Sequence, residues 1–81
     1  MTVPDEVRAV VHGHVQGVGF RWATRGRLAE LGLDGSATNR TDGTVEVVAT
    51  GAGADLARLV SWLRGGGTPG RVTRVDVVPR A

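Results

Sequence analysis

Apolar residues recur along the chain with two different periods, and each period predicts one kind of element. Over residues 7–13 every second position is apolar, and the same alternation recurs over residues 44–50 and 71–78. Successive side chains of a strand point to opposite faces of a sheet, so this period predicts three strands that are each buried on one face.

Two segments instead repeat apolar residues every three or four positions, which predicts helices over residues 20–31 and 55–64. Gly26 lies inside the first helix at a cost of roughly 1 kcal/mol relative to alanine, and we expect it to allow close packing against a strand. Gly32 is placed to cap that helix, and Asp55 suits capping or the dipole at the start of the second. The predicted buried stripes are Phe20, Thr24, Leu28 and Leu31, and Leu56, Leu59, Val60 and Leu63.

Residues 41–44, Thr-Asp-Gly-Thr, predict a hairpin turn. Asp-Gly accommodates the positive φ angles of a type I′ turn, so we expect that turn type here. The turn makes residues 35–41 the antiparallel partner of residues 44–50, although their composition alone predicts only a weak strand.

The resulting order is βαββαβ, and we expect one domain over residues 1–81. Two helices with one apolar stripe each fit one face of a four-stranded antiparallel sheet, with the other face solvated. The predicted fold class is therefore α+β, a ferredoxin-like sandwich with right-handed crossovers.

Composition narrows the classes of function. All ten basic residues are arginine, but eight acidic residues leave a net charge of only +2, which is too small for a nucleic-acid-binding surface. The chain has no cysteine and only two histidines, His12 and His14, and no further metal ligands cluster with them. No apolar run approaches the ~20 residues of a membrane span, and the first six residues lack a signal-peptide pattern, so we expect a cytoplasmic protein.

Residues 13–21, Gly-His-Val-Gln-Gly-Val-Gly-Phe-Arg, join the first predicted strand to the first predicted helix. Glycines let backbone N–H groups converge into an anion-binding nest, and a helix N-terminus adds partial positive charge. Arg21 supplies a permanent charge and a fork of donors that fits phosphate. A Walker loop is excluded because the chain has no lysine, and a dinucleotide fingerprint lacks its third glycine, since Trp22 stands there.

This segment resembles the acylphosphatase family closely. The resemblance continues through Leu31-Gly32-Leu33, Asn39, Asp42-Gly43 and Val45-Glu46 and covers essentially the whole chain. It implies the same βαββαβ sandwich, and an enzyme that hydrolyses the carboxyl–phosphate anhydride of small acyl phosphates to a carboxylate and inorganic phosphate. It also implies an enzyme that needs no metal and no cofactor, and we expect a monomer as the default state.

The resemblance also implies roles for individual residues. Arg21 is expected to bind the phosphate and Asn39 to orient the attacking water, since a carboxamide cannot act as a base near neutral pH. Gln16 is further expected to brace the loop through its side chain. The backbone amides expected to bind the phosphate are those of Val15, Gln16, Gly17, Val18, Gly19 and Phe20.

The chain departs from the family pattern at Gly35-Ser36-Ala37, where the family commonly has Gly-Trp-Val. The loss of an aromatic residue there is expected to reduce the buried area, and Trp22 or Trp62 is expected to compensate elsewhere. The same departure is expected to affect the placement of Asn39.

Two alternatives differ in class from a free acylphosphatase. The RRM fold shares the βαββαβ order but stacks RNA bases on sheet aromatics, and residues 44–50 contain none. A catalytically weak module that binds phosphate or carbamoyl phosphate, like the acylphosphatase-like domain of hydrogenase-maturation carbamoyltransferases, is the second alternative. The chain ends at Ala81 without zinc-finger cysteines, which we take to favour the free enzyme.

Overall fold

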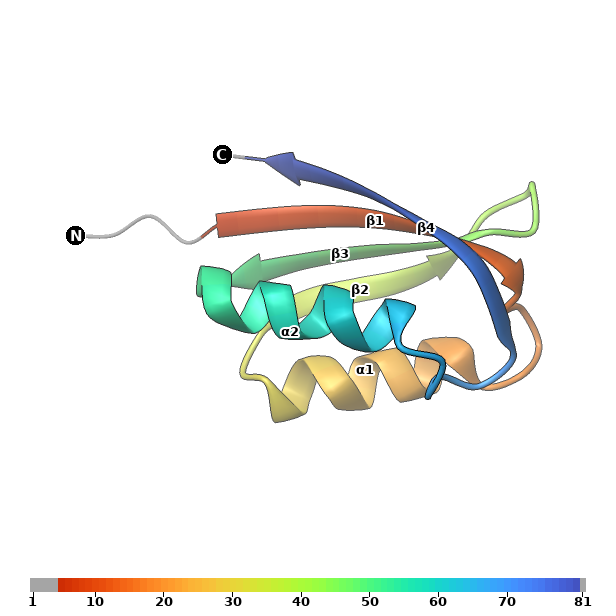
Figure 1. Cartoon of the computed structure of the whole chain (residues 1–81), viewed down its shortest axis with the longest axis horizontal. Coiled ribbons are helices and arrows are strands. Elements are labelled where there is room, and N and C mark those ends of the chain that lie inside the picture. Colours follow the sequence, from red (N-terminus) through yellow and green to blue (C-terminus); the bar gives the residue numbers. More distant parts are fainter. Residues whose placement is uncertain (1–4, 81) are drawn as a thin grey trace.

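The structure is a computed structural model that describes residues 5–80; residues 1–4 and 81, which include most of the N-terminal segment considered above, lie outside the described residues. The elements follow the predicted βαββαβ order (Figure 1). Their bounds are β1 Asp5–His14, α1 Phe20–Glu30, β2 Asp34–Asn39, β3 Val45–Gly51, α2 Gly53–Arg64 and β4 Arg71–Arg80.

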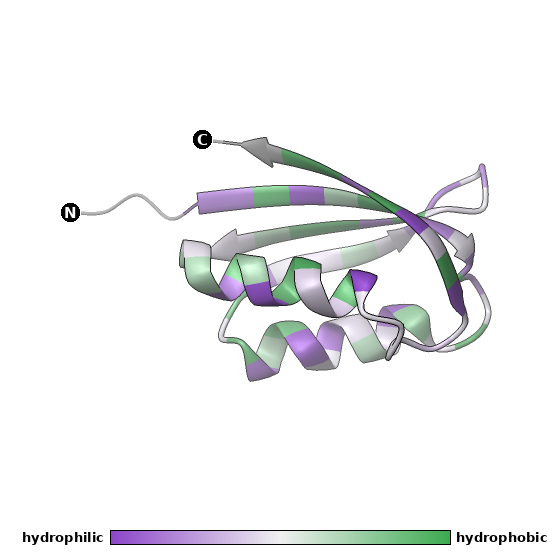
Figure 2. Ribbon diagram, viewed as in Figure 1, coloured by the Kyte–Doolittle hydropathy of each residue, from purple (hydrophilic) through white to green (hydrophobic). Residues whose placement is uncertain are grey.

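The four strands form one sheet in the order β2-β3-β1-β4, and every neighbouring pair is antiparallel. Both helices lie on the same face of this sheet (Figure 1). Hydrophobic and hydrophilic residues alternate along β1 (Figure 2) because only one of its faces is covered. The predicted fold class is thereby confirmed.

The core lies between the sheet and the helices, at the positions that the two periods predict, except that Leu31 and Val60 are only partly buried at its edge. Val7, Ala9 and Val11 of β1 are buried, and so are Val45, Val47 and Ala49 of β3. From the helices, the buried residues are Phe20, Thr24 and Leu28 of α1 and Leu56, Leu59 and Leu63 of α2.

The sequence predicts one residue at the end of α1 and one at the start of α2 that stabilise these helix ends, and the structure differs between the two. Gly32 follows α1 with φ of 67°, and the N–H of Leu33 reaches back to the Leu28 carbonyl at 2.9 Å. This is a Schellman cap, so the predicted cap is confirmed. Helix α2 starts at Gly53, two residues before the predicted start, and Asp55 makes no capping hydrogen bond. Asp55 instead lies in the first turn, where it can interact with the helix dipole, and pairs with Arg58 at 2.8 Å.

The β2–β3 hairpin exists, but the predicted type I′ turn is wrong. A type I′ turn needs positive φ at two successive residues, whereas Asp42 does not have positive φ and Gly43 does, at 89°. The Arg40 carbonyl accepts from the Gly43 N–H at 3.2 Å, and the Arg40 N–H donates to the Thr44 carbonyl at 2.8 Å. The loop is thus a three-residue hairpin loop, Thr41-Asp42-Gly43, and it ends β2 at Asn39 rather than at residue 41.

One packing expectation is also wrong, and a second holds for only one of its two residues. Gly26 is exposed, and a Cβ there would meet nothing within 4 Å, so no strand packs against it. Ser36 stands opposite Val48 on the open face of the sheet, where an aromatic residue would have lain. Of the two tryptophans expected to compensate, Trp22 does not, because it is 81% exposed on α1, whereas Trp62 is partly buried and packs against the core.

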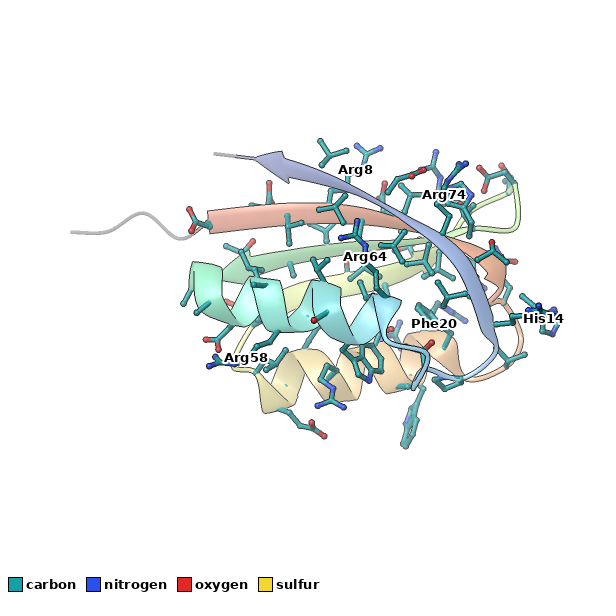
Figure 3. All side chains as sticks on the ribbon, in the orientation of Figure 1. Arg8, His14, Phe20, Arg58, Arg64 and Arg74 are labelled. Atoms are coloured by element: carbon teal, nitrogen blue, oxygen red, sulfur yellow. The ribbon has the colours of Figure 1, made fainter. Side chains whose placement is uncertain are left out.

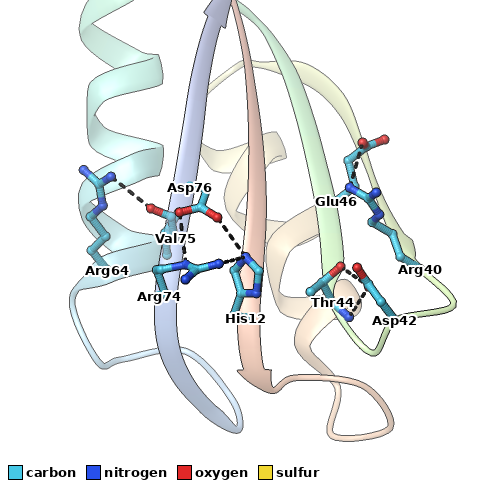
Figure 4. Close-up of polar contacts among 9 residues, drawn as sticks. All are labelled: His12, Arg40, Asp42, Thr44, Glu46, Arg64, Arg74, Val75 and Asp76. Carbon is cyan, nitrogen blue, oxygen red and sulfur yellow. Dashed lines mark hydrogen bonds and ion pairs between the residues drawn. The ribbon is translucent and has the colours of Figure 1, made fainter.

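Charged residues form ion pairs across the open face of the sheet (Figure 4). Glu46 pairs with Arg8 at 2.9 Å and with Arg40 at 3.8 Å. Asp76 of β4 pairs with Arg74 at 3.1 Å. This face is therefore solvated, as predicted for a two-layer fold, although it also carries valines such as the exposed Val78. Among residues 5–80, no helix is long and apolar enough to span a bilayer.

Candidate functional site

The end of β1 and the loop that joins it to α1 take their shape from three glycines. Gly13, Gly17 and Gly19 have φ of 126°, 75° and 84°, a region that residues with a side chain rarely adopt. Gly19 is also the N-cap of α1, so the loop leads directly into the positive end of the helix dipole. We call residues 13–19 the glycine loop.

The backbone donors of this loop are available to a ligand. Within the part of the chain that the structure describes, none of the N–H groups of residues 15–20 donates a hydrogen bond to a protein acceptor, and the first helical bond runs from the Ala23 N–H to the Gly19 carbonyl at 3.0 Å. The side chains of Val15 and Phe20 are buried in the core and fix the two ends of this stretch. Unpaired N–H groups held in this way form a binding site for an anion.

A hollow of about 170 Å³ opens at the glycine loop, and we call it the loop hollow. Arg21 lies on its border, is exposed, and forms no ion pair with any of residues 5–80. A free guanidinium beside unpaired amides is suited to a doubly charged oxyanion such as phosphate. The residues that line the loop hollow are Val15, Gly17, Gly19, Phe20, Arg21, Trp22 and Arg25.

Gln16 does not line this hollow, and its side chain ties the glycine loop to the β2–β3 hairpin. Its Nε2 donates to the carbonyl oxygens of Arg40 at 2.8 Å and of Thr44 at 2.9 Å. The bracing role predicted for this side chain is confirmed. Val18 is half-buried, and its side chain packs against the core.

Asn39 is the last residue of β2 and pairs with Val45 of β3. Its side chain is exposed, and it is not among the residues that line the loop hollow. The residue after it, Arg40, accepts the hydrogen bond from Gln16. The structure therefore brings Asn39 and the glycine loop to the same end of the sheet, joined through one side chain.

Two glycines allow the backbone to pack tightly behind the glycine loop. A Cβ at Gly13 would overlap the Arg71 carbonyl oxygen, and a Cβ at Gly70 would overlap the His14 carbonyl oxygen. The register of β1 against β4 also shifts between His12 and Gly13. The sequence alone does not indicate that Gly70 packs against His14, because the only signal there is a Pro-Gly pair in a segment interpreted as a connecting loop.

The two histidines lie apart from this hollow. His12 contacts Asp76 at 2.9 Å and Arg74 at 3.2 Å on the open face of the sheet (Figure 4). His14 points away from the body at the end of β1 (Figure 3). Among the residues described by the structure, no three His, Cys, Asp or Glu side chains gather as a metal-ion group.

Asp42 stabilises the hairpin that carries Asn39. Its carboxylate accepts hydrogen bonds from the Thr44 hydroxyl at 2.5 Å and from the Thr44 N–H at 3.0 Å (Figure 4). These two bonds favour the charged form and lower the pKa of the Asp42 carboxyl below its ordinary value.

Comparisons of the sequence and of the structure with known proteins indicate the same family. Residues 7–81 match the family model described as acylphosphatase. An acylphosphatase of Mycobacterium sp. (strain KMS) is 58% identical over 77 residues, which is 93% of this chain and 82% of that protein. The crystal structure of acylphosphatase from Bacillus subtilis has a TM-score of 0.88 at 35% identity and covers 94% of this chain and 84% of that one.

A more distant similarity concerns the fold alone. The crystal structure of full-length HypF in the phosphate- and nucleotide-bound form has a TM-score of 0.83 at 22% identity. The match covers 98% of this chain but only 11% of that one. At this identity the likeness shows that the two share an architecture.

Proposed function

Because this chain belongs to the acylphosphatase family and is an acyl phosphate hydrolase, we propose that Arg21 and the amides of residues 15–20 bind the phosphate of its substrate, while Asn39 orients the attacking water. One observation supports this proposal. Among the described residues, the loop N–H groups have no protein acceptor and Arg21 has no ion-pair partner, and both lie at the same hollow of about 170 Å³.

Charge stabilisation is the main contribution of the glycine loop. As the bond between phosphorus and the acyl oxygen lengthens, negative charge spreads over the three other phosphate oxygens. Preorganised N–H groups and the Arg21 guanidinium face that charge without needing to reorganise, because the glycines and the buried Val15 and Phe20 hold the loop in place.

Asn39 acts on the nucleophile. Its amide can accept a hydrogen bond from a water molecule and donate one to it, which orients the water without removing its proton. Water attacks phosphorus, the bond from phosphorus to the acyl oxygen breaks, and the leaving group departs as a carboxylate. We assign the proton of the water to the phosphate itself, since a carboxylate leaves without the help of a general acid.

The exposed position of Asn39 outside the loop hollow is compatible with this role. A water molecule in line with the leaving group must stand on the far side of phosphorus, and so outside the oxygens that the loop holds. Gln16 fixes the distance between the two parts, because it belongs to the glycine loop and donates to the residue next to Asn39.

We further propose that the enzyme acts as a cytoplasmic monomer on free small acyl phosphates, without a metal or a cofactor and without nucleic acid. One chain supplies every group of the proposed mechanism, since Arg21 and Asn39 come from α1 and β2. Size-exclusion chromatography and activity in EDTA test these points. A strong loss of activity in EDTA that a divalent metal restores would contradict the metal-free mechanism.

The experiment that tests the roles measures benzoyl phosphate hydrolysis and inorganic phosphate binding together. Arg21→Ala is expected to lose phosphate affinity and at least about 100-fold in kcat/KM. Asn39→Ala is expected to keep phosphate affinity and lose about 100-fold or more in kcat. Thr38→Ala is the matched control, because Thr38 precedes Asn39 but stands opposite Glu46 on the open face. Full turnover by Asn39→Ala would contradict the water-orienting role.

The alternative is a catalytically weak module that binds phosphate or carbamoyl phosphate. Its support is the shared architecture with the full-length HypF structure. A side-by-side rate measurement with acetyl phosphate and carbamoyl phosphate separates the two, because the alternative predicts slow turnover of acetyl phosphate and tighter binding of carbamoyl phosphate.

A further inference from the structure

A second and larger hollow lies beside the loop hollow on the helix layer. Its volume is about 610 Å³, and we call it the helix groove. Helix α1 supplies most of its wall, α2 supplies Trp62, and the segment after α2 supplies Gly67 and Pro69. None of these residues is among those proposed to bind the phosphate or the water directly.

One side of the helix groove is held firmly. The rings of Trp62 and Phe20 stack with centroids 6.4 Å apart. The Arg27 guanidinium lies 5.2 Å from the centroid of the Trp62 ring and also pairs with Glu30 at 3.1 Å. These contacts give the groove a fixed aromatic wall beside the buried end of the loop hollow.

Trp22 differs from Trp62 in having no such support. It is 81% exposed, and in the part of the chain that the structure describes it stacks on no other ring. An indole offers a large apolar face, which usually finds contact in a folded protein or its complexes. Trp22 borders the helix groove and the loop hollow alike, and Arg25 is the other residue that does so.

The space beside Trp22 is open. A Cβ built at Gly26 or at Gly67 would meet nothing within 4 Å. Neither glycine position therefore narrows the helix groove with a side chain.

The stereochemistry of the reaction indicates which part of the substrate extends toward the helix groove. In-line attack places the leaving carboxylate on the side of phosphorus opposite to the water. Asn39 is supplied by the sheet layer, and Gln16 bonds the glycine loop to the hairpin on that side. On the helix layer, α1 lines the loop hollow with four residues, and two of them, Trp22 and Arg25, also line the helix groove. The acyl group then extends toward Trp22.

We propose that Trp22 and the helix groove form the acyl-binding subsite and select aromatic acyl phosphates over acetyl phosphate, an inference that rests on the proposed roles of Arg21 and Asn39. The acyl ring lies against the exposed face of the Trp22 indole. Arg25 adds positive charge next to the phosphate, which is the same in every acyl phosphate, so it does not contribute to the choice between acyl groups.

The kinetic test compares benzoyl phosphate with acetyl phosphate. Trp22→Ala is expected to lower the ratio of the two kcat/KM values about fivefold, the size of one ring–ring contact. The change comes through a higher KM for benzoyl phosphate, with acetyl phosphate unaffected. Trp22→Phe keeps a flat ring and restores most of the ratio. Arg25→Gln is the matched control, because it weakens both substrates alike and leaves the ratio unchanged.

A binding measurement makes the test independent of turnover. Calorimetry with benzoylphosphonate and acetylphosphonate, which lack the scissile oxygen bridge, is expected to show tighter binding of the aromatic compound to the wild type. Trp22→Ala should lose that preference while it binds inorganic phosphate as the wild type does.

Two results would overturn the subsite. One is an unchanged preference for the aromatic compound in Trp22→Ala. The other is a loss of inorganic phosphate affinity in Trp22→Ala as large as the loss for benzoylphosphonate, since Trp22 would then support the loop hollow itself. Failure of the proposed roles would be seen separately, as full turnover by Asn39→Ala or as unchanged phosphate binding by Arg21→Ala.

Discussion

Gln16 is the side chain that joins the two halves of the proposed site. Its Nε2 donates to two hairpin carbonyls, of Arg40 and Thr44, and the second bond is partly buried. Gln16→Ala is expected to lower the free energy of unfolding by about 1–2 kcal/mol. It should also lower kcat about tenfold or more, because Asn39 is no longer held in register with the phosphate. Urea unfolding and steady-state kinetics measure the two effects.

A matched variant separates the donors of Gln16 from its size. Gln16→Glu keeps the shape but replaces the donating amide with oxygens that face two carbonyls, so it should impair kcat at least as much as alanine does. If Gln16→Ala lost stability but kept the wild-type kcat at a temperature where it is fully folded, Gln16 would be only a structural brace.

The sequence indicates most of the individual site residues because their chemistry is local. Three glycines before an arginine predict the exposed amides and the free guanidinium that the structure brings to one hollow. What local chemistry could not supply is contact across the fold. Gly70 packs against His14, and Trp22 and Trp62 share a groove, although both pairs are far apart in the sequence. The groove depends on how α1 and α2 lie against each other.

Glycine has two different roles in the elements around the site, and they give opposite predictions. Gly26 is helical and exposed, with nothing within 4 Å of a Cβ. Gly26→Ala is therefore expected to raise the free energy of unfolding by about 0.5–1 kcal/mol. Gly13→Ala should be strongly destabilising, because its Cβ would overlap the Arg71 carbonyl oxygen and its φ is 126°. Chemical denaturation of both variants measures the contrast, and a destabilised Gly26→Ala would contradict it.

The hairpin has a pH dependence that follows from Asp42. Its pKa is lowered in the folded state, first by the hydrogen bond from the Thr44 hydroxyl and then by the Thr44 N–H. A lowered folded pKa stabilises the protein above the unfolded pKa and loses that effect as the pH falls through the folded pKa. The wild type should therefore exceed Asp42→Asn in stability near about pH 6, by a margin that narrows toward about pH 3. A margin that stays constant in urea unfolding across this range would contradict the assignment.

The elements themselves were predictable where one apolar period was uninterrupted. The stripe through Leu56, Leu59 and Leu63 predicts α2, but Gly53 and Ala54 carry no periodic signal, so its start was placed too late. Asp-Gly fits more than one hairpin loop, and the sequence could not distinguish a type I′ turn from the three-residue loop that is present. The choice depends on the register of β2 against β3, which is a property of the pair.

In the whole molecule the proposed site lies at one end of the sheet, where both layers contribute. The sheet supplies Asn39, the helix layer supplies Arg21 and Trp22, and the glycine loop connects them. A phosphate held there contacts residues 15–21, whose arrangement depends on the rest of the fold, since Gln16 is bonded to the hairpin and Val15 and Phe20 are buried in the core. Binding is therefore coupled to the stability of the complete fold.

This coupling predicts that inorganic phosphate stabilises the protein through Arg21. At ten times its dissociation constant, a ligand that binds only the folded state adds about 1.4 kcal/mol. For a chain of 81 residues this corresponds to a rise in Tm of about 6 to 11 °C. Scanning calorimetry measures the shift, with sodium chloride at equal ionic strength as the control. Arg21→Ala should show no rise beyond that of the chloride control, because the amides alone hold the anion weakly. An equal rise in Arg21→Ala and wild type would place the phosphate elsewhere on the arginine-rich surface.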